Sequence, residues 1–257
     1  MKDWPSWVLP ATAALPPQVC ALTTYRFGPG QSVTPFDSLN LGLPPEDIEG
    51  DSPATVLQNR ELLCAELALP SPPHWLRQVH GVDVVHAQGP APQQAPSADA
   101  AVTDSKGTVL AVLTADCLPV VFASGDGRHI GIAHAGWKGL AAGVLEHTVR
   151  ALPVPAEELR VWLGPAAGPR AYEVGSEVYD AFMHVDHAAQ MAFCSTRPGY
   201  WLIDMYALAR SRLQQCGVLP QHITAVSRCT ITEERYFYSF RRDGVTGRMA
   251  TLVWTTP

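Results

Sequence analysis

Short apolar runs rich in β-branched residues alternate with helical patterns along most of the 257-residue chain. Apolar runs of about four to eight residues between turn residues are typical of strands, and apolar residues spaced three to four apart are typical of amphipathic helices. The strands predicted in this way cover residues 82–86, 109–113, 120–123, 130–133, 159–163 and 223–226. The predicted helices cover residues 55–67, 140–152, 176–183 and 205–216. Because the two kinds of element mix throughout, we expect an α/β or mixed α+β fold.

The C-terminal end of the chain predicts a β-hairpin. Residues 236–240 and 249–254 are mostly apolar or aromatic, and Asp243-Gly244 lies between them. An Asp-Gly pair between two such runs is typical of a tight hairpin turn.

The chain length favours a single domain, since domains peak near ~100–150 residues but mixed α/β domains reach ~250. The Pro- and Gly-rich stretches, such as residues 88–98, are short enough to be surface loops. We therefore expect one domain over residues 1–257. Hydrophobic residues make up 47% of the chain and charged residues 16%, a composition that excludes a disordered chain.

Charge and cysteine usage narrow the class of protein. The 18 Lys and Arg residues against 24 Asp and Glu residues give a net charge of −6, the wrong sign for a protein that binds the phosphate backbone of nucleic acids. No apolar run approaches the ~20 residues of a membrane-spanning helix, and the N-terminus lacks the apolar region of a secretory signal. The six cysteines form no CxxC pair, so we expect free thiols in a reducing compartment. These features predict a cytoplasmic protein with no nucleic-acid or membrane partner.

Three segments place a side chain that can bind a metal at a predicted strand end or turn. They are residues 77–81 (RQVHG), 114–119 (TADCLP) and 134–139 (HAGWKG), and they contribute His80, Cys117 and His134. Two imidazoles and a thiolate suit Zn²⁺ or copper and leave a fourth position open, as a catalytic zinc requires. The long separations match no compact zinc-finger spacing, so the residues alone leave a second interpretation open. In it, Cys117 is a small buried apolar residue and the histidines are hydrogen-bonded groups.

Further segments join these three: residues 164–169 (GPAAGP), 172–175 (YEVG) and 239–244 (SFRRDG). Together the segments closely resemble the laccase-domain family, which is also named polyphenol oxidoreductase, purine nucleoside phosphorylase and peptidoglycan editing factor. The resemblance extends from residues 23–24 and 38–42 (SLNLG), through Asn59-Arg60, to residues 246–248 (TGR). The chain departs from the family pattern at residues 23–28 (TTYRFG) and in GPAAGP, and neither departure removes a proposed metal ligand.

The resemblance implies that one zinc ion binds to His80, Cys117 and His134. It also implies a fold of layered mixed sheets flanked by helices, similar to that of the cytotoxic-necrotising-factor type of cysteine hydrolase. The implied substrates are purine nucleosides and inorganic phosphate: adenosine, inosine, guanosine and methylthioadenosine are cleaved at the glycosidic bond, and adenosine is deaminated by water. Zinc lowers the pKa of a bound water from ~15.7 toward ~7, so a hydroxide is available for deamination at neutral pH.

The implied reactions need residues that carry protons and bind phosphate. Deamination needs a proton carrier, for which Asp116 and Glu173 are the candidates. Asp116 could alternatively orient a ligand or hydrogen-bond loop amides. Phosphorolysis needs a cation for inorganic phosphate, and Arg60 is the candidate that matches the family, with a solvated helix arginine as the alternative. Arg241 and Arg242 are weaker candidates, because adjacent basic residues near a turn usually face water.

Other functions remain open. Cys117 could act as a thiolate nucleophile with His134 or His80 as its base, in a hydrolase that edits a UDP-muramoyl-amino acid precursor of peptidoglycan, and a zinc hydroxide could serve the same reaction. A multicopper oxidase is disfavoured because it needs about ten imidazoles in paired HxH motifs, and the chain has nine His and no HxH. A metal-binding protein without enzymatic activity is the remaining class.

Overall fold

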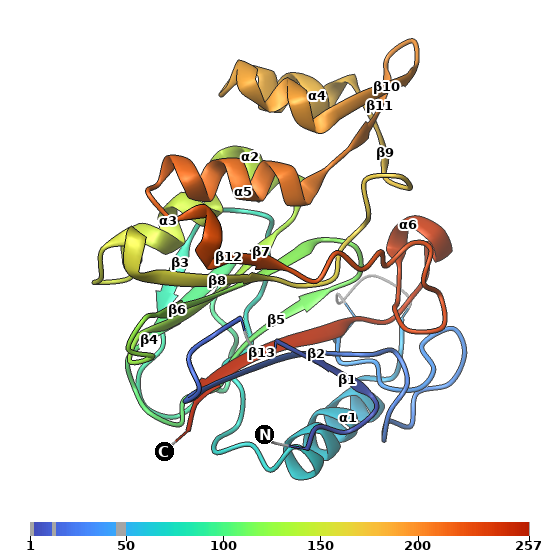
Figure 1. Cartoon of the computed structure of the whole chain (residues 1–257). Helices are drawn as coiled ribbons and strands as arrows, with labels where there is room; N and C mark the ends of the chain where they lie inside the picture. Colours follow the sequence, from blue (N-terminus) through green and yellow to red (C-terminus); the bar gives the residue numbers. More distant parts are fainter. Residues whose placement is uncertain (1–2, 12–13, 45–49, 257) are drawn as a thin grey trace.

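A six-stranded mixed sheet forms the centre of the protein in the computed structural model, which describes residues 3–11, 14–44 and 50–256 (Figure 1). In order across this sheet the strands are β12 (Ile223–Ala225), β8 (Leu159–Leu163), β6 (Leu118–Ser124), β7 (Ile130–Ala135), β4 (Ala100–Thr103) and β3 (Val84–His86). The two outer pairs are parallel, and the inner neighbours are antiparallel. The predicted mixed α/β class is therefore confirmed.

A second, antiparallel sheet packs against one face of the first. Its strands, in order, are β1 (Val8–Pro10), β2 (Val19–Thr24), β13 (Met249–Thr255) and β5 (Leu110–Thr114). The core between the two sheets contains Val112 and Val253 from the second sheet and Val121 and Ile132 from the first. Because both faces of the central strands are covered, these strands are continuous apolar runs rather than alternating ones.

Helices cover the two outer faces of this pair of sheets (Figure 1). The covering helices are α1 (Pro53–Glu66) on one side and α2 (Trp137–Ala142), α3 (Val144–Ala151) and α5 (Met205–Gln215) on the other. Two further helices, α4 (Ser176–Met183) and α6 (Phe240–Asp243), lie outside these layers, and 3₁₀ turns are formed by Ala156–Glu158, His187–Ala192 and Pro220–His222. Residues of α2, α3 and α5 share one core with Val120 and Phe122 of β6, and α1 packs Leu63 into the core that contains Leu252 of β13. In the described part of the chain, no helix combines the length and apolarity needed to cross a membrane.

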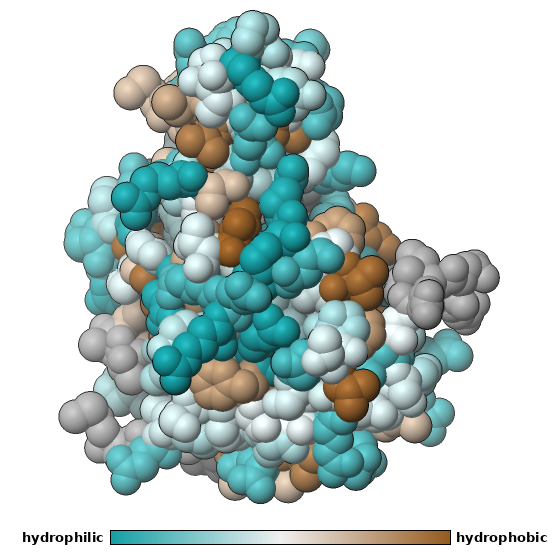
Figure 2. All heavy atoms as spheres, turned by 90° about the vertical axis from the view of Figure 1, so that its right-hand side faces the viewer, coloured by the Kyte–Doolittle hydropathy of each residue, from teal (hydrophilic) through white to brown (hydrophobic). Residues whose placement is uncertain are grey.

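A small antiparallel sheet and α4 form an arm that projects from the helix-covered side, at the top of Figure 1. Its strands are β10 (Phe193–Arg197), β11 (Tyr200–Ile203) and β9 (Glu173–Gly175). The arm has its own aromatic contact, in which the rings of Tyr179 and Trp201 stack with their centroids 4.4 Å apart. Figure 2 shows the arm above the face that carries α6, with hydrophilic side chains over the middle of that face.

Most predicted elements lie where the sequence places them, within a few residues at their ends. The predicted helix over residues 140–152 is two helices, because Gly143 between α2 and α3 has a left-handed φ of 102°. Six strands were not predicted from the sequence: β1, β2, β4, β9, β10 and β11. Several of these are short or lie in the arm, where an apolar pattern is weak.

The predicted C-terminal hairpin is wrong. Residues 236–239 form no strand, and Phe240–Asp243 form α6. The Ser239 side chain caps this helix by accepting a hydrogen bond from the amide of Arg242 (3.2 Å), which stabilises a helical turn where a strand was expected. The strand β13 instead pairs with β2 on one side and β5 on the other.

The core between β6 and the helix layer gives the first prediction. Phe122 has no exposed surface, so Phe122→Ala should lower the free energy of unfolding by about 3–5 kcal/mol through lost burial and the cavity left behind. Met191, which is 92% exposed, provides the control, and Met191→Ala should change stability by less than about 0.5 kcal/mol. Urea unfolding measures both variants. Equal midpoints for Phe122→Ala and the parent would contradict this packing.

Candidate metal centre

His80, Cys117 and His134 come together at one end of the central sheet. Cys117 lies in the turn that leads into β6, and His134 lies near the end of β7. These two strands are antiparallel, and Pro119 is the partner of His134 in their register. The start of β6 therefore lies beside the end of β7, which places the thiol next to the imidazole. His80 reaches the same point from the loop before β3.

The three side chains have the spacing of a metal site. One ligand atom from each residue lies within 4.8 Å of the others, and His80 Nε2 is 3.9 Å from Cys117 Sγ. In a tetrahedral zinc site with bonds of ~2.0–2.3 Å, such atoms are roughly 3.5 Å apart. His134 is 3% exposed, whereas His80 is exposed, so the group is open to solvent on one side. The donor set and spacing fit one zinc or copper ion with a free coordination position.

Asp99, which is not among the residues predicted from the sequence, connects two of these ligands. This carboxylate is fully buried and accepts a hydrogen bond from His134 Nδ1 (2.8 Å), which leaves Nε2 toward Cys117. It also accepts the backbone amides of Val79 (3.1 Å), His80 (3.0 Å) and Gly81 (2.7 Å). Burial opposes ionisation of Asp99, but the bonds from His134 and the amides outweigh it and lower the pKa. Asp99 directly precedes β4, a strand that was not predicted.

Two glycines make room for this arrangement. A Cβ atom on Gly136 would lie 2.6 Å from His80 Cδ2 and 3.1 Å from Cys117 Sγ, and one on Gly139 would lie 2.9 Å from the carbonyl oxygen of Gly81. These contacts give both glycines of the HAGWKG segment a steric role. The backbone is also strained here, since His80 has a φ of 59°.

The cysteine and the buried histidine perturb each other's pKa. Burial would raise the pKa of Cys117, but His134 and His80 outweigh it and lower the value to about 6. Burial would lower the pKa of His134, but Cys117 and Asp99 raise it to about 9. Without a metal, the pair therefore consists of a thiolate and an imidazolium at neutral pH. The thiolate is also the form in which cysteine binds a metal.

Asp116 ties the Cys117 turn to two other segments. It has a φ of 102°, and its carboxylate accepts hydrogen bonds from Thr230 Oγ1 (2.6 Å) and from the backbone amide of Arg241 (2.7 Å). Its carbonyl oxygen accepts the amide of Ala167 (2.9 Å). These contacts match the alternative interpretation of Asp116, a carboxylate that hydrogen-bonds loop groups. Proton transfer by Asp116 stays a prediction.

Glu173 lies at the base of the arm, in β9. Its carboxylate accepts hydrogen bonds from Thr196 Oγ1 (2.7 Å) and Arg197 Nη2 (2.8 Å). These two bonds lower its pKa, whereas an efficient proton carrier has a pKa near the working pH. The contacts of Glu173 are therefore those of a surface ion pair, and its proposed catalytic role is untested.

Arg60 lies on α1, the helix that covers the second sheet. Its Nε donates to the carbonyl oxygen of Leu41 (2.9 Å), and its guanidinium stacks 4.1 Å from the ring centroid of Trp75. Burial, partly offset by Cys64, lowers its pKa to about 10. Among its contacts in the described ranges, none is with the three proposed metal ligands. Phosphate binding by Arg60 also stays a prediction.

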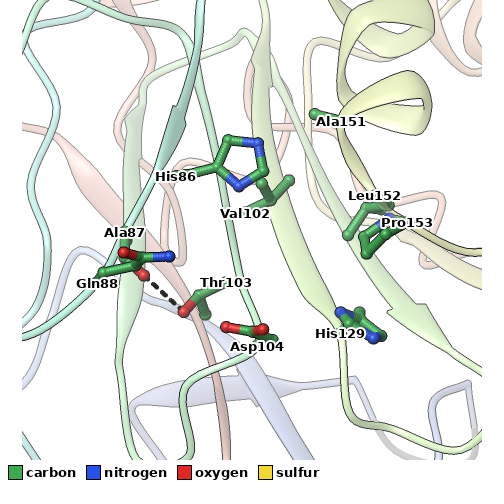
Figure 3. A pocket seen from close by; sticks show the side chains of 10 residues that line it. All are labelled: His86, Ala87, Gln88, Val102, Thr103, Asp104, His129, Ala151, Leu152 and Pro153. Carbon is green, nitrogen blue, oxygen red and sulfur yellow. Dashed lines mark hydrogen bonds between the residues drawn. The ribbon is translucent and has the colours of Figure 1, made fainter.

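A small cavity lies at the opposite end of β4 and β7 from the metal centre (Figure 3). His86, Asp104 and His129 are among the residues that line it. Within the described residues, however, His80, Cys117 and His134 are the one group of three or more such side chains with the spacing of a metal site. The cavity is therefore not a second metal centre of this kind.

Proteins of known sequence are similar to this chain over nearly its whole length. The family model described as "Multi-copper polyphenol oxidoreductase laccase" matches residues 20–256. A Xylella fastidiosa protein named purine nucleoside phosphorylase is 54% identical over 99% of either chain. An Escherichia coli protein named purine nucleoside phosphorylase YfiH is 49% identical over 93% of this chain and 95% of that protein.

Solved structures extend the likeness to the fold. The structure of a Neisseria meningitidis protein has a TM-score of 0.90 at 42% identity and covers 98% of this chain and 100% of that one. YlmD from Geobacillus stearothermophilus has a TM-score of 0.89 at 31% identity, over 100% of this chain and 98% of that one. The likeness therefore includes all the layers described above.

The contact between Gly136 and two proposed ligands gives the second prediction. Gly136→Ala should displace His80 and Cys117 and strongly reduce the amount of metal bound per chain, while the protein remains folded. In Gly81→Ala, by contrast, the new Cβ would meet nothing closer than 3.5 Å, so this variant in the same site should bind metal normally. Elemental analysis after dialysis against zinc measures both. Full metal content in Gly136→Ala would rule out the proposed geometry.

The third prediction concerns Cys117 in metal-free protein. Its alkylation rate by iodoacetamide should be nearly constant above pH 6 and fall about tenfold per pH unit below it, because the thiolate is the reactive form. Mass spectrometry of the Cys117 peptide measures the rate. Cys64 is an internal control, since burial and Glu61 raise its pKa and its alkylation should be slow at neutral pH. An inflection for Cys117 near the ordinary value of ~8.5 would contradict stabilisation by the two histidines.

Proposed function

The chain belongs to the family described as multi-copper polyphenol oxidoreductase laccase, and from this membership and the site geometry we propose that it is a purine nucleoside phosphorylase. The observation that carries the proposal is the convergence of His80, Cys117 and His134 within 4.8 Å on a partly exposed surface. The names of the Xylella and Escherichia relatives support the reaction class. We take the reaction centre to be this group of side chains.

Phosphorolysis exchanges one bond at the sugar. An oxygen of inorganic phosphate forms a bond to C1′ of the ribose, while the bond from C1′ to the purine nitrogen breaks. The electron pair of that bond leaves with the purine, which takes up a proton, and ribose 1-phosphate is the other product. We propose adenosine, inosine, guanosine and methylthioadenosine as substrates, with the sulfur-containing substrate yielding the corresponding methylthio sugar phosphate.

We further propose that the protein deaminates adenosine to inosine and ammonia with water as the reactant. His80, Cys117 and His134 would hold the zinc ion, which would supply Lewis acidity to this reaction. Within the chain, Asp99 holds the imidazole of His134 in one orientation, and its bonds to three amides fix the loop that carries His80. Asp116 and Glu173 remain the proposed proton carriers.

The donor set favours zinc over the several copper ions of the family description. A multicopper oxidase needs paired HxH motifs to hold a blue copper and a trinuclear cluster, and the chain has nine His and no HxH. The described residues provide one three-ligand group. One such group holds one ion, which suits hydrolysis and phosphorolysis better than the reduction of oxygen.

One observation favours a second candidate function. The lowered pKa of Cys117, about 6, and its position beside His134 are also typical of a thiolate nucleophile with its base. The corresponding proposal is a hydrolase that releases a wrongly incorporated amino acid from a UDP-muramoyl precursor of peptidoglycan. A metal-binding protein without catalysis is the third possibility, and it predicts bound metal with no turnover.

Metal removal gives the fourth prediction and separates these functions. Chelation should abolish the release of free adenine from adenosine, and zinc should restore it, because the proposed reaction needs the bound ion. Product chromatography with and without phosphate makes the measurement. Free adenine that forms only with phosphate indicates phosphorolysis, and inosine that forms without phosphate indicates deamination.

Variants complete this test. Cys117→Ala and His80→Ala should lose metal and activity together, whereas Cys194→Ala, which removes an exposed thiol, should keep both. Full activity in metal-free Cys117→Ala would refute the zinc mechanism. Hydrolysis of a UDP-muramoyl precursor that survives chelation but is abolished by alkylation would favour the thiolate hydrolase.

A further inference from the structure

Arg248 lies near the turn that carries the proposed ligand Cys117. Arg248 directly precedes β13, and Met249 is the register partner of Thr114, the last residue of β5. Arg248 therefore lies at the same edge of the second sheet as the turn that carries Asp116 and Cys117. The negative charges of these two residues also act on it, raising its pKa against the larger lowering caused by burial.

Arg248 has unused hydrogen-bond donors and no carboxylate partner. Its Nη1 donates to the carbonyl oxygens of Thr246 and Gly247 (2.9 Å each), and its guanidinium lies 5.9 Å from the ring centroid of Phe240. The described residues offer no hydrogen-bond acceptor to Nε or Nη2. Among the ion pairs of the described chain, none includes Arg248. A partly buried cation with no paired anion destabilises the folded protein unless a negatively charged ligand binds to it.

One segment far from Arg248 in the sequence holds it in place. The side-chain oxygen of Asn40 accepts both the amide of Gly42 (3.0 Å) and the amide of Arg248 (2.9 Å). A Cβ atom on Gly42 would lie 2.5 Å from Arg248 Cγ, so only glycine leaves space for the arginine side chain. These contacts assign a role to residues 38–42 (SLNLG) and 246–248 (TGR), which the proposed metal centre does not use.

Arg241 supplies a second cation near the same turn. Its backbone amide is held by the carboxylate of Asp116 (2.7 Å), and its guanidinium lies 5.0 Å from the ring centroid of Tyr172. Burial raises the pKa of the Tyr172 hydroxyl, and the neighbouring Arg241 guanidinium partly offsets this rise.

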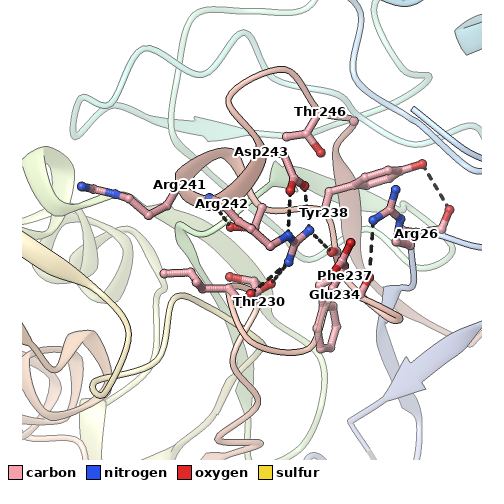
Figure 4. Close-up of polar contacts among 12 residues, drawn as sticks. Arg26, Thr230, Glu234, Phe237, Tyr238, Arg241, Arg242, Asp243 and Thr246 are labelled. Atoms are coloured by element: carbon pink, nitrogen blue, oxygen red, sulfur yellow. Dashed lines mark hydrogen bonds and ion pairs between the residues drawn. The ribbon is translucent and has the colours of Figure 1, made fainter. Parts of the chain in front are cut away.

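Arg242 differs from its neighbour in this respect. Its guanidinium pairs with the carboxylate of Asp243 (2.7 Å) and donates hydrogen bonds to the carbonyl oxygens of Thr230 (2.9 Å) and Ile231 (3.1 Å). In Figure 4, the Arg241 side chain extends away from this network. Within the described residues, Arg242 therefore has an ion pair and Arg241 has none, while the Arg241 guanidinium lies over the Tyr172 ring.

We propose that Arg248 and Arg241 bind the inorganic phosphate that attacks the nucleoside. The inference rests on the proposed phosphorylase function and locates one of its two substrates. A planar guanidinium with free donors binds two phosphate oxygens at once, and two such groups match a phosphate dianion. At this position the phosphate lies beside the Cys117 turn, so that it and a nucleoside at the metal centre are neighbours. The guanidinium of Arg60, in contrast, donates a hydrogen bond to the carbonyl oxygen of Leu41 and stacks on the ring of Trp75.

Replacement of Arg248 tests the proposal. In zinc-loaded Arg248→Gln, the KM for phosphate at saturating inosine should rise about 10- to 100-fold, as expected for the loss of charge-assisted hydrogen bonds, with little change in the KM for inosine. Arg248→Lys should restore part of the affinity, since it restores the charge but not the planar fork. Arg128→Gln is the control, because Arg128 is 80% exposed and pairs with Asp126 in the β6–β7 turn.

Two further measurements keep the outcome independent of folding and of turnover. Calorimetric titration with inorganic phosphate should detect binding to the parent protein and to Arg128→Gln, but weaker binding to Arg248→Gln. Gly42→Ala, which retains the arginine but fills its space, should also weaken phosphate binding. Urea unfolding of each variant shows whether a loss of phosphate binding comes from misfolding. If Arg248→Gln is misfolded, the phosphate affinity of Arg248→Lys is compared with that of the parent protein instead.

The results separate this inference from the proposed function. Unchanged phosphate affinity in Arg248→Gln and Arg248→Lys, or no phosphate binding by the parent protein, would overturn the phosphate site. A rise in the KM for phosphate in Arg60→Gln but not in Arg248→Gln would move the site to α1 and overturn it as well. Phosphate binding that depends on Arg248, in a protein that cleaves no nucleoside, would support the anion site and refute the phosphorylase.

Discussion

The antiparallel pairing of β6 with β7 is the constraint on which the candidate site depends. It places the start of one strand beside the end of the other, with Pro119 opposite His134, and so brings Cys117 to the imidazole. The buried carboxylate of Asp99 then adds the third ligand, because it binds His134 and the loop of His80 at once. A change of register by one residue would move His134 to the other face of the sheet and dismantle the group.

Local strain and tight contacts are concentrated around this group. His80 and Asp116 both have positive φ values, 59° and 102°, in regions that non-glycine residues rarely adopt, and such strain is typical of functional sites. Gly136 touches two ligands, and Gly42 leaves space for Arg248. The same turn thus joins the proposed metal site to the proposed phosphate site, since Asp116 precedes Cys117 and holds the backbone of Arg241.

The sequence predicts elements and ligands better than it predicts their partners. Central strands such as β8 are visible as apolar runs because both of their faces are buried, and the three ligand segments are visible as motifs. The hairpin failed because an aromatic run and an Asp-Gly pair say nothing of the cap at Ser239. Asp99 and Arg248 were missed for a similar reason. The residues that contact each of them are distant in the sequence. Arg60 matches the family pattern, but its guanidinium donates to the carbonyl oxygen of Leu41.

The most direct test of the central claim is X-ray absorption spectroscopy of the purified protein, combined with elemental analysis. The account predicts about one zinc ion per chain whose inner shell contains one sulfur and two imidazole nitrogens, with an oxygen or nitrogen ligand in the fourth position. Two or more copper ions per chain, or a bound zinc with no sulfur in its inner shell, would contradict it.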